Sequence, residues 1–206
     1  MNSYKRAIIN GIVIGIALIV VIGFVVKPSP DNTPKPTVTG QAVIGGAFTL
    51  TDDTGVRVNN TDFAGNYMLV YFGYSFCPDV CPLDLQKISM ALSELEDSDT
   101  DLSNLQPLFI TIDPERDTPE IMHEYLEHFH PKILGLSGSL DDIKIAARAY
   151  RVYHAKGEVQ EDGSYLMDHS SIVYLLGPNG EYLRHFSPEE TPENMAAGIK
   201  SVIDND

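Results

Sequence analysis

The sequence predicts an α/β domain with a mixed central sheet, preceded by one N-terminal transmembrane helix. Two observations favour the α/β class. Strand-like and helix-like segments alternate along residues 37–206, and the last two strand-like segments are joined by a short turn. A third observation, the uncharged stretch Ala7–Val26, predicts the membrane helix.

The stretch Ala7–Val26 is long enough to cross a membrane, because a helix rises about 1.5 Å per residue and the hydrocarbon core is about 30 Å thick. Lys5 and Arg6 precede it, and only Lys27 follows closely. This bias predicts a single-pass protein of a bacterial-type inner (plasma) membrane, with residues 1–6 in the cytoplasm and the domain in the periplasm or outside. A cleaved signal peptide would have a shorter apolar region and a small-residue cleavage site, so an uncleaved anchor is favoured.

Composition divides the remaining chain into a linker and one domain. Residues 27–36 contain four prolines, which is typical of an extended polyproline II spacer. Residues 37–206 are long enough to bury a single core. The chain has 14 basic and 29 acidic residues, and a net charge of −15 repels phosphate backbones, so we expect no nucleic-acid partner.

The first half of the domain contains a predicted hairpin, two buried strands and a helix. Tyr67–Phe72 is continuously apolar and aromatic, as expected of a central strand that is covered on both faces. A helix is predicted from about Pro82, because apolar residues then recur every three or four positions. The other segments are the hairpin Ala47–Thr51 and Val56–Val58, with a turn at Gly55, and the strand Leu105–Ile112.

The second half continues the alternation and closes with a hairpin and a helix. Thr118 and Ser139 are suited to cap two helices, Pro119 to about Phe129 and Leu140–Tyr150. The remaining segments are the strand Ile133–Leu136, the strands Ser171–Leu176 and Glu181–Phe186 around the turn Gly177-Pro178-Asn179-Gly180, and the helix Pro192–Ile203. This order of elements suits a thioredoxin-like fold.

Cys77 and Cys81, the only cysteines of the chain, lie between the central strand and the helix that follows it. If the segment is near-helical, residues four apart share one face and lie within disulfide range. A helix N-terminus also stabilises thiolates, so both sulfurs are expected to be reactive. The spacing is therefore compatible with a structural disulfide, a redox pair or a metal clamp.

A metal clamp needs a further donor, and histidine is the natural candidate. His123, His128 and His130 lie on one predicted helix and at its end, where solvated surface positions are expected, and His154 lies in a polar stretch. His169 differs because it immediately precedes a predicted central strand, in a loop that this fold brings near the first helix. A hydrogen-bonded structural role for His169 remains the alternative to a ligand.

Three motifs follow one another along the chain: Tyr71-Phe72-Gly73-Tyr74-Ser75-Phe76 leading into Cys77-Pro78-Asp79-Val80-Cys81-Pro82, the segment from Thr111 to Pro119, and Asp168-His169-Ser170. Together they resemble the Sco/SenC family, membrane-anchored copper-binding proteins that assist cytochrome c oxidase assembly. The resemblance implies a thioredoxin-like fold in which Cys77, Cys81 and His169 ligate one copper ion, copper(I) or copper(II). Asp113 is expected to cap or form a salt bridge, with tuning of the metal loop as the alternative. Met167 is expected to be a buried apolar residue, with a soft metal donor as the alternative.

The resemblance leads to two functional hypotheses that use the same residues. The first is a copper chaperone that delivers copper to the copper A subunit of cytochrome c oxidase. The second is a thiol:disulfide oxidoreductase in which Cys77 and Cys81 form a redox-active disulfide and keep the oxidase's copper-ligating cysteines reduced. Other copper carriers or thiol reductants are the further partners that these roles imply.

Overall fold

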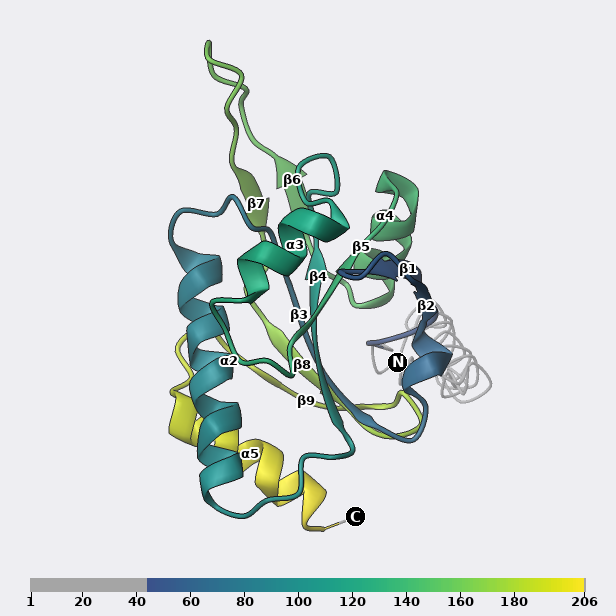
Figure 1. The fold of residues 1–206 in the computed structure, drawn as a ribbon, viewed down its shortest axis with the longest axis vertical. Helices are drawn as coiled ribbons and strands as arrows, with labels where there is room; N and C mark the ends of the chain where they lie inside the picture. Colours follow the sequence, from purple (N-terminus) through teal and green to yellow (C-terminus); the bar gives the residue numbers. More distant parts are fainter. Residues whose placement is uncertain (1–43, 206) are drawn as a thin grey trace, which may run out of the picture. The chain divides into compact units, whose positions relative to one another are not determined.

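The computed structural model describes residues 44–205, and they form a thioredoxin-like α/β fold with a mixed seven-stranded sheet (Figure 1). The sheet has the strand order β2-β1-β5-β4-β3-β8-β9. Its strands are β1 (Thr49–Asp52), β2 (Arg57–Asn59), β3 (Tyr67–Gly73), β4 (Leu105–Thr111), β5 (Leu134–Ser137), β8 (Val173–Leu176) and β9 (Tyr182–Phe186). A separate two-stranded sheet pairs β6 (His154–Lys156) with β7 (Met167–His169).

The helices connect and cover these strands. They are the 3-10 helix η1 (Asn60–Phe63) and the α-helices α2 (Val80–Asp97), α3 (Pro119–Leu126), α4 (Leu140–Ala149) and α5 (Pro192–Ile203). Strands β3, β4 and β5 are parallel, whereas β8 runs antiparallel to β3, and β1 runs antiparallel to β5. The carboxyl ends of β3 and β4 and the amino end of β8 therefore meet at one edge of the sheet.

The central strand β3 explains why the core has two layers. All seven of its residues are buried, as the continuous apolar run predicts. Tyr67, Leu69 and Tyr71 pack with residues of α2, α3 and α5 on one face. Met68, Val70 and Phe72 pack with residues of α4 on the other face. Side chains alternate along a strand, so each face receives every second residue.

The predicted helix caps are confirmed. The Thr118 hydroxyl accepts a hydrogen bond from the Ile121 N–H, and the Ser139 hydroxyl accepts one from the Asp142 N–H. The Asp142 carboxylate in turn accepts a bond from the Ser139 N–H, which completes a capping box. The predicted helix ending at Phe129 is too long, because α3 ends at Leu126.

The β6–β7 hairpin is absent from the sequence prediction. It projects beyond the large sheet at the upper edge of Figure 1 and carries His169 at its base. The prediction of a loop at His169 is therefore wrong, since this residue ends β7. The strands of the hairpin have only three residues each and carry charged side chains, so they lack the apolar alternation of a long buried strand.

The predicted anchor at residues 7–26 and the linker at 27–36 lie outside the described residues. Across 44–205, none of the helices combines the length and the apolar character needed to span a membrane.

Candidate metal centre

Cys77, Cys81 and His169 converge at the sheet edge where β3 ends and β8 begins. Their ligand atoms all lie within 4.8 Å of one another. Sγ of Cys81 is 3.3 Å from Nε2 of His169, although 88 positions separate the two residues in sequence. Within residues 44–205 they are the only group of three or more histidines, cysteines or acidic residues arranged closely enough to hold a metal ion. The structure thus brings the three predicted ligands together.

The two cysteines occupy different environments because helix α2 begins between them. This start is earlier than the predicted one at about Pro82. Helix α2 starts at Val80, so Cys81 lies in its first turn, whereas Cys77 precedes the helix. The backbone N–H of Cys81 donates a hydrogen bond to Sγ of Cys77 at 3.4 Å. Both thiols are free; Cys77 is partly exposed and Cys81 is fully buried.

Gly73, the last residue of β3, makes room for the buried sulfur. A Cβ at this position would lie 3.0 Å from Sγ of Cys81 and 2.8 Å from Cε2 of Phe109. Such distances are shorter than ordinary van der Waals contact. The glycine therefore lets helix α2 approach the strand closely enough to place Cys81 beside His169.

A backbone carbonyl fixes the orientation of the His169 ring. Nδ1 lies 3.1 Å from the Ser170 carbonyl oxygen, which can only accept, so Nδ1 carries the proton and donates. The lone pair of Nε2 then faces the sulfur of Cys81. Metal-binding histidines are commonly held in this way by their second nitrogen. The rings of Tyr74 and Tyr71 meet the imidazole edge-on, at centroid distances of 6.0 Å and 6.5 Å.

Burial determines the protonation of the ligands in the metal-free protein. It raises the pKa of the Cys81 thiol well above its ordinary value, and the negative charge of a Cys77 thiolate adds to this effect. The expectation of an activated sulfur is therefore wrong for Cys81, because its loss of solvation is the largest influence on its pKa and favours the neutral thiol. Burial also lowers the pKa of His169, which keeps the imidazole neutral and able to bind a cation.

Asp84 is a buried carboxylate close to the centre, and sequence reasoning did not identify it. Its Oδ2 accepts hydrogen bonds from the hydroxyls of Tyr71, at 3.1 Å, and Ser171. Its Oδ1 pairs with Nζ of Lys87 at 3.1 Å. Because these partners occupy the carboxylate, Asp84 supports the residues around His169 and is not placed as a ligand. The sequence does contain one signal for Asp84, because it follows Cys81 by about one helical turn and so lies on the same side of α2.

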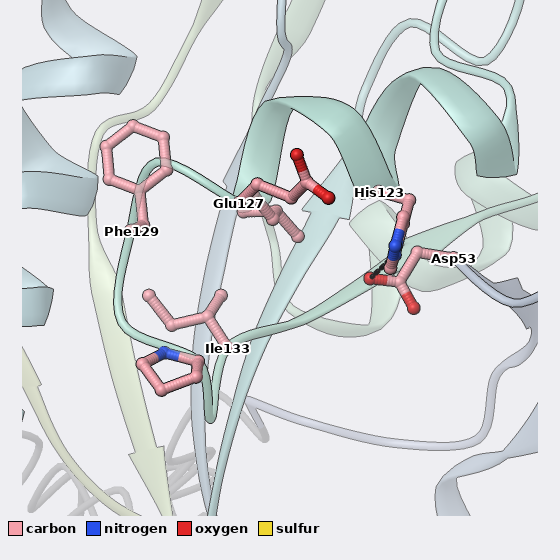
Figure 2. Close-up of a pocket in the computed structure, with 7 residues that line it drawn as sticks. Asp53, His123, Glu127, Phe129 and Ile133 are labelled. Carbon is pink, nitrogen blue, oxygen red and sulfur yellow. Dashed lines mark ion pairs between the residues drawn. The ribbon is translucent and has the colours of Figure 1, made fainter.

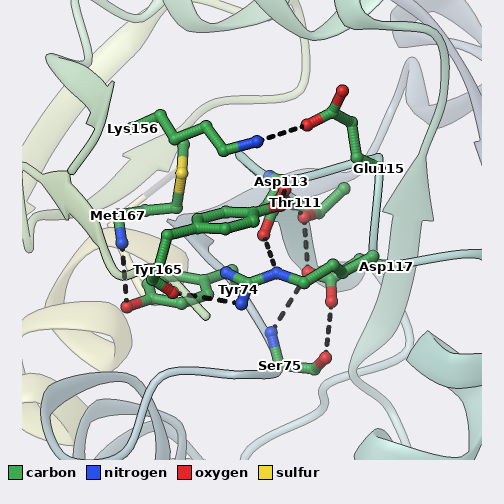
Figure 3. A network of polar contacts seen from close by, with 10 residues as sticks. Tyr74, Ser75, Thr111, Asp113, Glu115, Asp117, Lys156, Tyr165 and Met167 are labelled. Carbon is green, nitrogen blue, oxygen red and sulfur yellow. Dashed lines mark hydrogen bonds and ion pairs between the residues drawn. The ribbon is translucent and has the colours of Figure 1, made fainter. Parts of the chain in front are cut away.

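The loop after β4 forms a polar network with Ser75 and Tyr165 (Figure 3). Asp113 forms the predicted salt bridge, with Arg116, and also accepts a hydrogen bond from the Tyr165 hydroxyl at 3.0 Å. Asp117 is fully buried and accepts bonds from Ser75 and from the Thr111 hydroxyl. The network thus joins this loop to the segment before Cys77 and to the β6–β7 hairpin.

Met167 lies at the edge of the same network. It is half-buried and packs against the apolar cluster on the α4 face of the sheet, so the expectation of a buried apolar residue holds in part. Its backbone N–H donates to the Tyr74 hydroxyl at 3.1 Å. This bond fixes β7 two residues before His169.

The other histidines lie outside the ligand group. His123 is exposed, and its Nδ1 lies 3.8 Å from a carboxylate oxygen of Asp53; both residues line a surface pocket together with Phe129 and Ile133 (Figure 2). His128 is exposed as predicted. The expectation of a solvated surface position is wrong for His130, which is buried and pairs with Glu96 at 3.2 Å. His154 is half-buried on β6, directly opposite His169.

The donor set fits copper chemically. Two thiolate sulfurs and one imidazole nitrogen are soft or intermediate ligands, and the group contains no carboxylate that would favour calcium or magnesium. The same set also suits zinc. The geometry therefore defines a site for a soft cation with at least three protein ligands.

Comparisons with known proteins identify relatives of this chain. The family model described as SCO1/SenC matches residues 36–204. Human protein SCO1 homolog, mitochondrial, is 46% identical over 160 residues, covering 78% of this chain and 53% of the relative. A SCO2-like protein of Rickettsia felis is 38% identical over 197 residues, covering 92% of this chain and 95% of the relative. The chain spans about half the length of the eukaryotic relatives first matched.

Two solved structures are similar to this chain and contain copper. Arabidopsis thaliana ScoI with copper bound is 39% identical, with a TM-score of 0.74, and the match covers 79% of this chain and 99% of that one. Yeast Sco1 with copper bound is 37% identical, with a TM-score of 0.74, and the match covers 80% of this chain and 90% of that one. The similar proteins therefore share the thioredoxin-like fold, and these two bind copper.

Proposed function

Because the chain belongs to the SCO1/SenC family, we propose that it is a copper chaperone that binds one copper ion through Cys77, Cys81 and His169. The acceptor is the copper A site of cytochrome c oxidase during its assembly. One observation supports this most directly: two sulfurs and an oriented imidazole nitrogen lie within 4.8 Å of one another. Copper-bound relatives of the same fold favour copper over zinc as the ion.

The different exposure of the ligands suggests how the ion leaves. Cys77 is partly exposed, whereas Cys81 is buried against β3 and His169 is held by Ser170. An incoming thiolate would therefore first reach the copper on the Cys77 side. Three-coordinate copper(I) leaves room for such a ligand, so transfer proceeds through shared thiolates while Cys81 and His169 still hold the ion.

The proposal includes the membrane anchor at residues 7–26, the linker at 27–36 and a domain at 37–206 on the outer side of a bacterial-type inner membrane. Its support is the uncharged length of the first segment, the basic residues before it and the prolines after it. Tethering would raise the effective concentration of donor and acceptor at the membrane.

A direct test is the copper(I) affinity of the purified full-length chain, measured by competition with a coloured copper(I) chelator. We expect one copper per chain and a weakening of about tenfold or more in His169→Ala. His128→Ala removes an exposed imidazole and serves as the matched control. Equal affinities in wild type and His169→Ala would contradict the ligand assignment.

Thiol:disulfide exchange is the second candidate, and the pairing of Cys77 with Cys81 favours it. The Cys81 N–H contacts Sγ of Cys77, so the two sulfurs share one side of the helix start. In this reaction the dithiol of Cys77 and Cys81 becomes a disulfide, and two electrons and two protons pass to a disulfide of the oxidase subunit. The deciding measurement is whether the reduced, copper-free chain reduces an oxidised copper A subunit faster than a small dithiol does. Equal rates would exclude this role.

A further inference from the structure

His154 lies directly across the hairpin from His169. The two residues are Cα partners in the antiparallel pairing of β6 with β7. The neighbouring pair is hydrogen-bonded, because the Ser170 N–H donates to the Tyr153 carbonyl at 3.0 Å. Bonded and non-bonded pairs alternate along an antiparallel ladder, so His154 and His169 form a non-bonded pair. Their side chains therefore share one face, with Cβ atoms about 4.5–5.5 Å apart.

The imidazole of His154 has space and no polar partner. It lines a pocket of about 220 Å³ together with apolar side chains, among them Ile143 and Met167, and with the charged residues Asp113, Glu115, Lys144 and Lys156, none of which bonds to the ring. Between residues 44 and 205 the ring makes no hydrogen bond and no ion pair, although it is half-buried. Most half-buried imidazoles find a partner, since an unpaired polar group out of water is unfavourable. A second imidazole thus stands free beside the proposed copper site.

We propose that His154 becomes a fourth ligand when the bound ion is copper(II). Copper(I) is satisfied by the three ligands Cys77, Cys81 and His169, whereas copper(II) favours four donors in a tetragonal arrangement. His154 is outside the group whose ligand atoms lie within 4.8 Å of one another. Binding therefore requires its ring to rotate from the pocket toward His169, and the cross-strand spacing places it within reach. This inference rests on the proposed function.

The test compares the full-length wild type with His154→Phe, which keeps a ring in the pocket but has no donor nitrogen. Copper(II) is added anaerobically to the reduced protein, and pulsed electron paramagnetic resonance counts the coordinated imidazoles. We expect two imidazoles in the wild type and one in the variant. The dissociation constant for copper(II) should rise about tenfold or more, while that for copper(I) stays within about twofold.

Two controls separate this inference from other causes. His123→Phe removes an exposed imidazole on α3 and should leave every value unchanged. Retained copper(I) affinity shows that His154→Phe is folded. If His154→Phe is unstable, the same measurements are made on His154→Gln. A wild type with one coordinated imidazole, or a copper(II) affinity that His154→Phe does not change, would overturn the inference. Failure of the proposed function would instead appear as unchanged copper(I) affinity in His169→Ala.

Discussion

The guanidinium carbon of Arg116 lies 3.7 Å from the centre of the Tyr165 ring. Arg116 belongs to the loop after β4, whereas Tyr165 precedes β7, so the contact joins the loop to the hairpin that carries His169. The same guanidinium lies 4.8 Å from the Phe76 ring, next to Cys77, and its NH1 donates to the Tyr165 carbonyl at 3.1 Å. One side chain therefore contacts both segments that supply metal ligands.

The first prediction concerns Arg116→Met, which keeps the length of the side chain and removes its charge and hydrogen bonds. The hairpin and the segment before Cys77 lose their shared contact, so the ligands are held less rigidly. We expect the dissociation constant for copper(I) to rise about tenfold, as for other residues that orient metal ligands. Arg148→Met on the exposed side of α4 is the control. Unchanged affinity in Arg116→Met would show that the ligands need no such support.

The sequence predicts the large sheet and its helices well, because their signals are local. The continuous apolar run at Tyr67–Phe72 indicates a central strand whatever lies elsewhere in the chain. The caps at Thr118 and Ser139 likewise depend only on residues three positions away. The β6–β7 hairpin has no such signal, because its strands are short and polar. Its contacts with distant parts of the chain, such as that between Arg116 and Tyr165 just before β7, cannot be read from a local pattern.

The metal centre likewise combines features that local sequence signals predict with features that depend on long-range packing. Spacing and the family motifs single out Cys77, Cys81 and His169, and the structure brings their ligand atoms together. The burial of Cys81 and the carboxylate of Asp84 depend on how α2 packs on β3, which no local pattern encodes. His154 and His169 lie opposite each other because of the register of the hairpin, which no local sequence pattern indicates.

The second prediction concerns Gly73→Ala. The new methyl group would lie 3.0 Å from Sγ of Cys81, so the start of α2 must shift away from β3. We expect overpacking to lower the free energy of unfolding by about 1–3 kcal/mol and to weaken copper(I) binding. Chemical denaturation and chelator competition measure the two effects.

Gly138→Ala provides the control for that variant. A Cβ there would approach Leu50 at 3.2 Å, in the core beside α4 and away from the cysteines. Gly138→Ala should lower the free energy of unfolding and leave the copper(I) affinity unchanged. If both variants weakened copper binding equally, the effect of Gly73→Ala would reflect general destabilisation.

The third prediction concerns the order in which the two thiols react. Cys77 is partly exposed, whereas Cys81 is fully buried and its pKa is raised by burial. Iodoacetamide attacks thiolates that it can reach, so it should modify Cys77 well before Cys81 in the reduced, copper-free chain. Peptide mass spectrometry at short reaction times gives the order. In denaturant the difference should disappear, and faster labelling of Cys81 in the folded chain would contradict the structure.

The fourth prediction is the pH dependence of copper(I) affinity. Burial raises the pKa of Cys81 above its ordinary value, so between about pH 6.5 and 8 the metal-free thiol is protonated. Copper binds the thiolate, and binding therefore releases this proton. Higher pH favours the proton-releasing state, so the dissociation constant should fall by at least about tenfold per pH unit.

His169 should add little to this slope. Burial lowers its pKa, so the imidazole is already neutral above about pH 6.5 and releases no proton when copper binds. His169→Ala should therefore weaken binding at every pH while keeping the slope. Chelator competition at several pH values, corrected for protonation of the chelator, measures both quantities. An affinity that did not change with pH would mean that Cys81 is already ionised in the metal-free protein.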